Sequence, residues 1–144
     1  MIVRSIKSLE HPGAPHRNII YEEISGKGTK YRLLKTHWCN AGITVNAELG
    51  AYVKLNSKGF LRVGAGYEWN GPNVVVDNKS TMRASLIHDA LCQLVEIGQL
   101  SDMWIPVIND MFEQHCIEDG LPVFLAKAYR KGLYIGWKEW QYRR

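Results

Sequence analysis

A His-Asp pair, His88-Asp89, lies within an otherwise apolar run that begins at Leu86 and ends at Leu91. A second carboxylate, Asp110, follows the histidine by 22 positions (110 − 88 = 22). An Asp held against one ring nitrogen fixes the tautomer of a His and stabilises its protonated form, so that the other nitrogen can take a proton from water. These residue types therefore predict a hydrolase site in which His88 is the base and Asp110 orients it.

Asp89 is expected to point about a quarter turn away from His88, because successive side chains of a helix are separated by roughly 100°. A carboxylate there suits a hard cation such as Ca²⁺, whose remaining ligands would be backbone carbonyls and waters. Such a cation would polarise a carbonyl oxygen and stabilise the oxyanion. Asp89 is thus the predicted metal ligand. The turn signal Trp69-Asn70-Gly71-Pro72-Asn73 is expected to support the site, through Trp69, Asn70, Gly71 and Asn73.

Three helices are predicted to carry these residues. The first begins near residue 80 and ends at about residue 97, because Gly98 favours a left-handed stop. The second runs from about residue 101 to Gly120, and the third from about 122 to 140. On the first helix, His88 shares its face with small or medium residues, so a second, antiparallel helix can approach closely.

The surroundings of Asp110 suggest why it needs a partner. The strongest apolar stripe of the second helix is Ile105, Ile108, Phe112 and Cys116, and Asp110 lies on the other side, which also carries apolar residues. A carboxylate in a partly buried stripe costs several kcal/mol unless it is paired, and His88 is the nearest plausible partner. The alternative is that His88 and Asp110 satisfy each other without doing any chemistry.

The first half of the chain has the pattern of β-strands. Residues 19–21 and 31–34 are rich in strand formers, and residues 51–55 and 60–63 flank a turn signal, as in a hairpin. The predicted fold class is therefore α+β. A small antiparallel sheet within residues 1–69 and a three-helix unit within residues 80–140 would form a single domain over residues 1–144.

The cysteines and the apolar runs bear on where the protein works. Cys39, Cys92 and Cys116 lack the paired spacing of a metal site. If the first two helices are antiparallel, Cys92 and Cys116 lie roughly 15 Å apart along the axis, so free thiols are predicted. No run is apolar enough to span a membrane, and the start of the chain does not resemble a signal peptide. An intracellular protein without a transmembrane segment is expected.

The C-terminal end combines positive and aromatic side chains, within a chain of 18 Lys and Arg against 14 Asp and Glu. Such an end could contact an anionic membrane surface or nucleic acid. The alternative is a solvated helix face whose aromatic residues pack inward. The candidate contact residues are Lys127, Arg130, Lys131, Trp137, Lys138 and Trp140.

Several motifs resemble a family of phage and prophage proteins classed as a domain of unknown function. The family carries a Trp-Asp-Gly-Pro-Ser loop, a His-Asp-Ala-Leu-Tyr-Gln-Leu helix and an Ala-Asp-x-x-Phe helix. The matching parts of this chain are Gly66 to Asn73, Met82 to Leu94, and Asp110 with Phe112. The resemblance covers roughly residues 60 to 136 and implies a phage or prophage origin.

A more distant resemblance is to the paired-helix core of phospholipase A2, particularly its small bacterial and fungal members. In that family the His is the base, the neighbouring Asp binds Ca²⁺, and an Asp of the second helix orients the His. Carried over, these roles fall on His88, Asp89 and Asp110. The resemblance implies a calcium-dependent lipid hydrolase.

The chain departs from the phage family at four positions. Asn70 and Asn73 replace an Asp and a Ser, Cys92 replaces a Tyr, and Pro106 replaces an Arg. These losses favour a second interpretation, a catalytically inactive phage accessory protein.

The interpretations that stay open differ in their partners. A phage-encoded lipid hydrolase would engage anionic lipid. An accessory protein would be a virion or tail component, or an inhibitor that binds a host defence protein, so its partner would be a phage or host protein. Nucleic acid is not expected as a partner, since no recognised binding motif is found. The expected location is the host bacterial cytoplasm, with association with the virion as the alternative.

Overall fold

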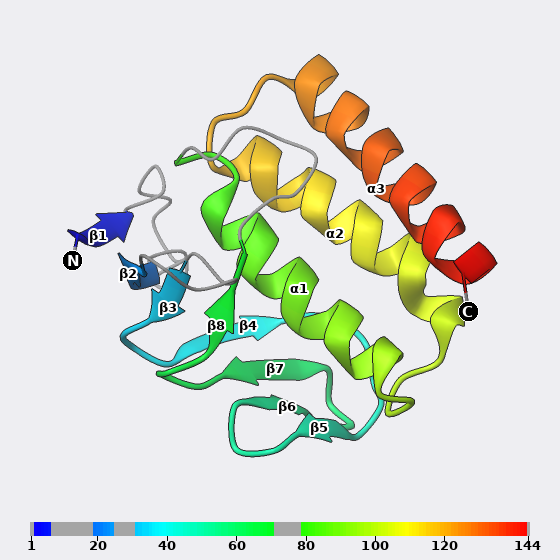
Figure 1. Ribbon diagram of the computed structural model, residues 1–144, viewed down its shortest axis with the longest axis horizontal. Helices are drawn as coiled ribbons and strands as arrows, with labels where there is room; N and C mark the ends of the chain where they lie inside the picture. The colour runs from blue at the N-terminus through cyan, green and yellow to red at the C-terminus, as the bar shows by residue number, and fades with distance from the viewer. Residues whose placement is uncertain (1, 7–18, 25–30, 71–78, 144) are drawn as a thin grey trace.

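The computed structural model describes residues 2–6, 19–24, 31–70 and 79–143. Within them eight strands form two four-stranded antiparallel sheets, and three α-helices follow (Figure 1). The α+β class is therefore confirmed. The strands are β1 (Ile2–Ile6), β2 (Ile19–Glu23), β3 (Tyr31–Leu33), β4 (His37–Asn40), β5 (Ala47–Leu49), β6 (Val53–Leu55), β7 (Phe60–Val63) and β8 (Glu68–Trp69).

The single predicted sheet is in fact two, because the chain changes sheets between β3 and β4. Sheet A has the order β1-β2-β3-β8, and sheet B has the order β4-β7-β6-β5. The backbone bends at Leu34 and Lys35, after which β4 pairs with β7 rather than continuing beside β2. The predicted hairpin is confirmed as β6 and β7, which pair Val53 with Val63.

The helices are α1 (Met82–Glu96), α2 (Ile105–Glu118) and α3 (Val123–Arg143), with a short 3₁₀ turn, η1 (Asp102–Trp104), before α2. As predicted, α1 and α2 are followed by glycines with a positive φ, 80° at Gly98 and 103° at Gly120. Thr81 is the N-cap residue of α1, but its side chain makes no capping hydrogen bond.

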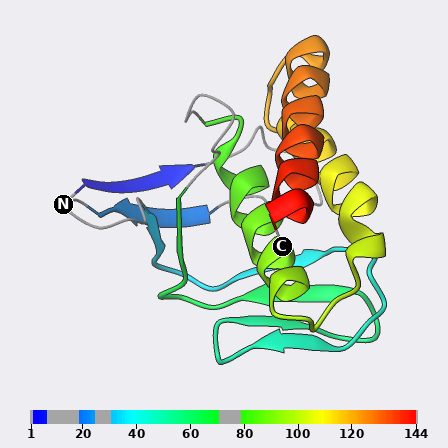
Figure 2. The same ribbon diagram turned by 45° about the vertical axis from the view of Figure 1, so that its right-hand side comes forward.

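The elements stack in a fixed order, seen from two directions in Figures 1 and 2. Helix α1 lies over sheet B and also packs against α2, and α3 packs against the other side of α2. Ten of the fifteen residues of α1 are buried, because it has neighbours on opposite sides. This explains the nearly continuous apolar run around His88.

In the described part of the chain, no helix combines the length and apolar composition that crossing a membrane requires.

Candidate functional site

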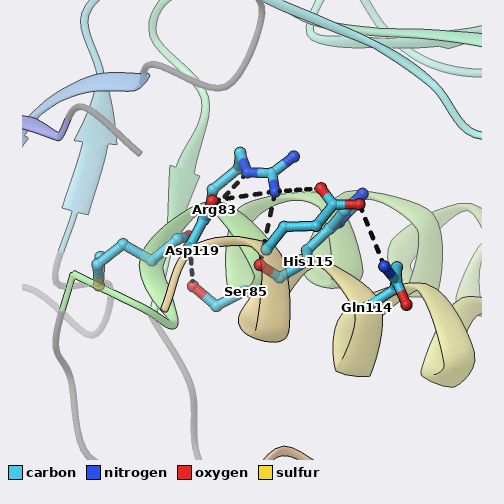
Figure 3. A network of polar contacts seen from close by, with 7 residues as sticks. Arg83, Ser85, Gln114, His115 and Asp119 are labelled. Atoms are coloured by element: carbon cyan, nitrogen blue, oxygen red, sulfur yellow. Dashed lines mark hydrogen bonds and ion pairs between the residues drawn. The ribbon is translucent and has the colours of Figure 1, made fainter. Parts of the chain in front are cut away.

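A buried ion-pair network holds the start of α1 against the end of α2 (Figure 3). The Arg83 guanidinium donates from Nε to Asp119 Oδ2 over 2.9 Å and from Nη2 to Asp119 Oδ1 over 3.1 Å. Nη2 also donates to Glu118 Oε2 over 3.0 Å. Only 5% of the Arg83 side chain is exposed, so this bidentate contact is shielded from water. The network fixes how α1 and α2 lie against each other.

The contacts between α1 and α2 run in opposite chain directions, as predicted for an antiparallel pair. Arg83, near the start of α1, contacts the end of α2, whereas His88, further along α1, contacts Asn109 and Phe112. The rings of His88 and Phe112 meet edge to face, with 5.5 Å between their centroids. The His88 ring is thus held in the helix interface, and 13% of its side chain is exposed.

The partner of His88 on α2 is Asn109 and not Asp110. His88 Nε2 lies 2.9 Å from Asn109 Oδ1, and Asn109 is buried with 4% exposure. Asp110 instead forms an ion pair with Arg130 of α3, and 63% of its side chain is exposed. The prediction that Asp110 orients His88 is therefore wrong, because one residue along a helix turns the side chain by about 100°.

Asn109 could have been found from the sequence. It lies four residues after Ile105 and three before Phe112, inside the very stripe that was recognised as the most apolar face of the helix. A single polar residue in such a stripe needs a buried partner.

The second ring nitrogen of His88 faces residues of its own helix. Nδ1 lies 4.0 Å from Asp89 Oδ1, too far for a direct hydrogen bond. Cys92 follows His88 by one helical turn, and its Sγ lies 3.7 Å from both ring nitrogens. The sulfur is therefore equally far from the two nitrogens and within contact distance of both. His88 is thus surrounded by an amide, a carboxylate and a thiol.

These neighbours change the acidity of the ring. Burial alone would lower the pKa of His88, but the electrostatic effect of Cys92 and the polar groups of Asp89, Cys92 and Asn109 around the ring outweigh it and raise the pKa to about 10. The pKa of Asp89 is raised, mainly by burial, although His88 and the backbone N–H of Asn70 act in the opposite direction. A raised His pKa means that the ring carries a proton at neutral pH.

The predicted supporting loop is only partly described. Trp69 is buried, and its Nε1 donates to Ser85 Oγ over 3.1 Å, so it anchors the end of β8 to α1. The next residue, Asn70, is exposed but supplies the backbone N–H that reaches Asp89. Gly71 and Asn73 lie outside the described residues. The described part of the loop therefore contributes a structural anchor and one hydrogen bond to the site.

The donors near Asp89 bear on the expected calcium ion. Calcium takes six to eight oxygen ligands. Within the described ranges, no group of three His, Cys, Asp or Glu side chains could hold a metal. These side chains alone do not complete a calcium site.

A groove of about 770 Å³ runs between α2 and α3. Two of its lining residues, Ile105 and Asn109, are buried, and Asn109 is the same residue that contacts His88. Five of the six predicted surface contacts line it, namely Lys127, Arg130, Lys131, Trp137 and Lys138. Trp140 belongs to α3, but its side chain is not described. The groove thus carries more basic than acidic residues and is partly aromatic, and Asn109 is the residue that it shares with the His88 cluster.

All three cysteines are free, and for Cys92 and Cys116 this was predicted from the helix geometry. Burial raises the pKa of Cys39 to about 11 and that of Cys116 to about 12. Both thiols stay protonated at neutral pH, and a protonated thiol is a poor nucleophile.

Comparison of the chain with protein-family models, with curated proteins and with solved structures finds no match. The resemblances to the phage family and to phospholipase A2 thus remain predictions from the sequence. The structure is that of an α+β protein in which His88, Asn109 and Cys92 form a cluster in an antiparallel helix pair.

Proposed function

We propose that the protein is an ester hydrolase in which His88 transfers the protons. One observation carries this proposal: Asn109 Oδ1 holds Nε2 of His88, while Nδ1 faces Asp89 and Cys92. Because an amide oxygen can only accept, Nε2 keeps its proton and Nδ1 is the nitrogen that exchanges one. A His with one nitrogen fixed and the other free is the arrangement that general acid–base catalysis requires.

In the simplest reaction, neutral Nδ1 takes a proton from a water molecule as the water oxygen attacks the ester carbonyl. The tetrahedral intermediate then re-forms the carbonyl and expels the alcohol, which receives the proton from the imidazolium. Asp89 stabilises the charged ring during these steps, and Asn109 positions it. Because the pKa of His88 is about 10, hydrolysis by this route increases as the pH rises from neutral towards that value.

The substrate class we propose is an ester of anionic lipid. The α2–α3 groove supports this choice, since four of its lining residues are cationic against two acidic ones, Asp102 and Glu113, and two are aromatic. Positive charge attracts a phosphate head group, and aromatic side chains pack well at a lipid–water boundary.

Calcium binding by Asp89 is a separate proposal, since a bound calcium ion would need oxygen ligands in addition to those of the described side chains. Titration calorimetry on the wild type beside Asp89→Asn tests it. Heat of binding that is lost in the variant would support the calcium site, and equal heats would contradict it.

Hydrolysis is tested with two substrates, a soluble p-nitrophenyl ester and anionic phospholipid vesicles. We expect wild-type protein to release product from both, and His88→Gln to lose the activity by on the order of a hundredfold. Release from neither substrate by the wild type, or equal release by the variant, would contradict the proposal.

A second candidate is a phage accessory protein without catalysis, either a virion or tail component or an inhibitor that binds a host defence protein in the host cytoplasm. The basic groove favours it, because a binding surface of this charge does not depend on an active site. Phage infection assays would distinguish the two. A His88→Gln variant with full biological effect would support the accessory role.

A further inference from the structure

The thiol of Cys92 occupies a place in the site that the water mechanism does not use. Cys92 lies one turn after His88 on α1, half-buried, with Sγ 3.7 Å from the ring nitrogens. It makes no disulfide. A thiol next to a His whose far nitrogen is held by an Asn amide is a known arrangement for nucleophilic catalysis.

The hydrogen bond at Nε2 of His88 leaves Nδ1 as the nitrogen that can accept the proton of the Cys92 thiol. Asn109 Oδ1 accepts from Nε2, so that nitrogen cannot receive another proton. Nδ1 is therefore the acceptor that remains, and Cys92 Sγ is within reach of it. Proton transfer gives an imidazolium beside a thiolate, and the Asp89 carboxylate, 4.0 Å from Nδ1, adds negative charge near the positive ring.

We propose that Cys92 is a nucleophile of this site, which attacks the acyl carbon of an ester. The inference rests on the proposed hydrolase function for its substrate class but adds a covalent step.

The reaction balances without any further reactant than water. The thiolate forms a sulfur–carbon bond, the ester carbon–oxygen bond breaks, and the leaving alcohol takes the proton from His88 Nδ1. Water then attacks the S-acyl group while Nδ1 takes a water proton. The sulfur–carbon bond breaks, the carboxylic acid leaves, and the thiolate–imidazolium pair is restored.

The other two cysteines provide controls within the same molecule. Burial raises the pKa of Cys39 and of Cys116, and neither thiol belongs to the cluster around His88. A reagent that reacts with thiolates should therefore distinguish the three side chains in one folded sample.

The first test is alkylation with iodoacetamide at neutral pH, followed by peptide mass spectrometry to give a rate for each cysteine. We expect Cys92 to react at least about tenfold faster than Cys39 and Cys116, and His88→Gln to remove most of this advantage. Asp110→Asn, an exposed position on the adjacent helix, should leave the rates unchanged. Circular dichroism verifies that each variant is folded. A Cys92 rate no higher than the others, or one that is unaffected by His88→Gln, would overturn the inference.

The second test separates this inference from the proposed function. Wild type, Cys92→Ala and His88→Gln are compared on the soluble p-nitrophenyl ester, and the wild type is quenched early to look for an acyl adduct on Cys92. Loss of hydrolysis in Cys92→Ala together with an adduct supports the covalent step. Hydrolysis that survives in Cys92→Ala but not in His88→Gln overturns it and leaves the hydrolase standing. Fast, His88-dependent alkylation without any ester hydrolysis supports a reactive thiol and contradicts the proposed function.

Discussion

Asn109 Oδ1 lies 2.9 Å from His88 Nε2, across the interface of two antiparallel helices. Both partners are largely removed from solvent, and the aspartate next in sequence, Asp110, pairs with Arg130 of α3 instead. This one contact determines which ring nitrogen of His88 is available for chemistry.

Loss of the Asn109 amide should destabilise the fold. Asn109→Ala leaves the N–H of a mostly buried imidazole without its partner, so we expect the free energy of unfolding to fall by about 1–3 kcal/mol. Asp110→Ala breaks only a solvent-exposed ion pair and should cost less than about 1 kcal/mol. Urea unfolding of both variants measures the difference. Equal losses of unfolding free energy would show that the buried contact contributes no more to stability than the exposed ion pair.

The charge state of His88 should make stability depend on pH. Its pKa is raised from 6.5 to about 10 on folding, so the folded state binds this proton more tightly than the unfolded state. The resulting stabilisation is complete below pH 6.5 and is lost as the pH rises through about 10. The His88→Gln variant keeps the other ionisable groups of this region, which are Asp89, Cys92, Tyr67 and Glu96.

The measurement is urea unfolding of wild type and His88→Gln across that pH range. The wild type should lose more stability than the variant between about pH 6 and pH 10. Ionisation of Cys39 and Cys116 occurs in both proteins, so it cancels in the difference. A difference that stays constant would contradict the raised pKa of His88.

Arg83 should be the most costly cation to remove. Arg83→Met leaves Asp119 buried without a counter-charge, and breaking such a pair costs about 3–5 kcal/mol. Arg130→Met is the matched control, because its ion pair with Asp110 is exposed. Thermal or urea unfolding compares them. Similar midpoints for the two variants would contradict the role of the Arg83 network in holding α1 against α2.

The fold could be predicted from local signals to a large extent. The β6–β7 hairpin and the glycines after α1 and α2 are set by short-range turn chemistry, and the structure has them where the sequence indicated. The division into two sheets was missed, because pairing of β3 with β8 and of β4 with β7 joins residues far apart in the chain.

The candidate site was predicted less completely, for a reason of helical phase. The sequence picks out His88 and Asp89, but it offers two adjacent polar residues, Asn109 and Asp110, as partners on α2. The charged residue, Asp110, was the one assigned a function from the sequence. The buried position is held by the neutral Asn109, because burying an amide costs less free energy than burying a carboxylate. The apolar stripe of α2 favours Asn109, and the packing of α1 against α2 makes it the partner of His88.

The groove between α2 and α3 makes a prediction about anionic surfaces. Basic residues near a membrane contribute about 1 kcal/mol each, so replacing both Lys127 and Lys131 by Gln should weaken binding to anionic vesicles by roughly thirtyfold. A double Lys54→Gln and Lys58→Gln variant removes the same charge from sheet B and its turn, away from the groove. Co-sedimentation with vesicles compares them. An equal effect of the two double variants would show that net charge, and not the groove, controls binding.

The most direct test of the account compares hydrolysis of a soluble p-nitrophenyl ester by Asn109→Leu and by Asp110→Asn. Leucine has nearly the shape of asparagine but cannot accept from His88 Nε2, so we expect the rate to fall by at least about tenfold. Asp110→Asn should retain the wild-type rate, because Asp110 faces Arg130 and not the ring. Full activity in Asn109→Leu together with loss in Asp110→Asn would contradict the assignment of Asn109 as the residue that positions His88.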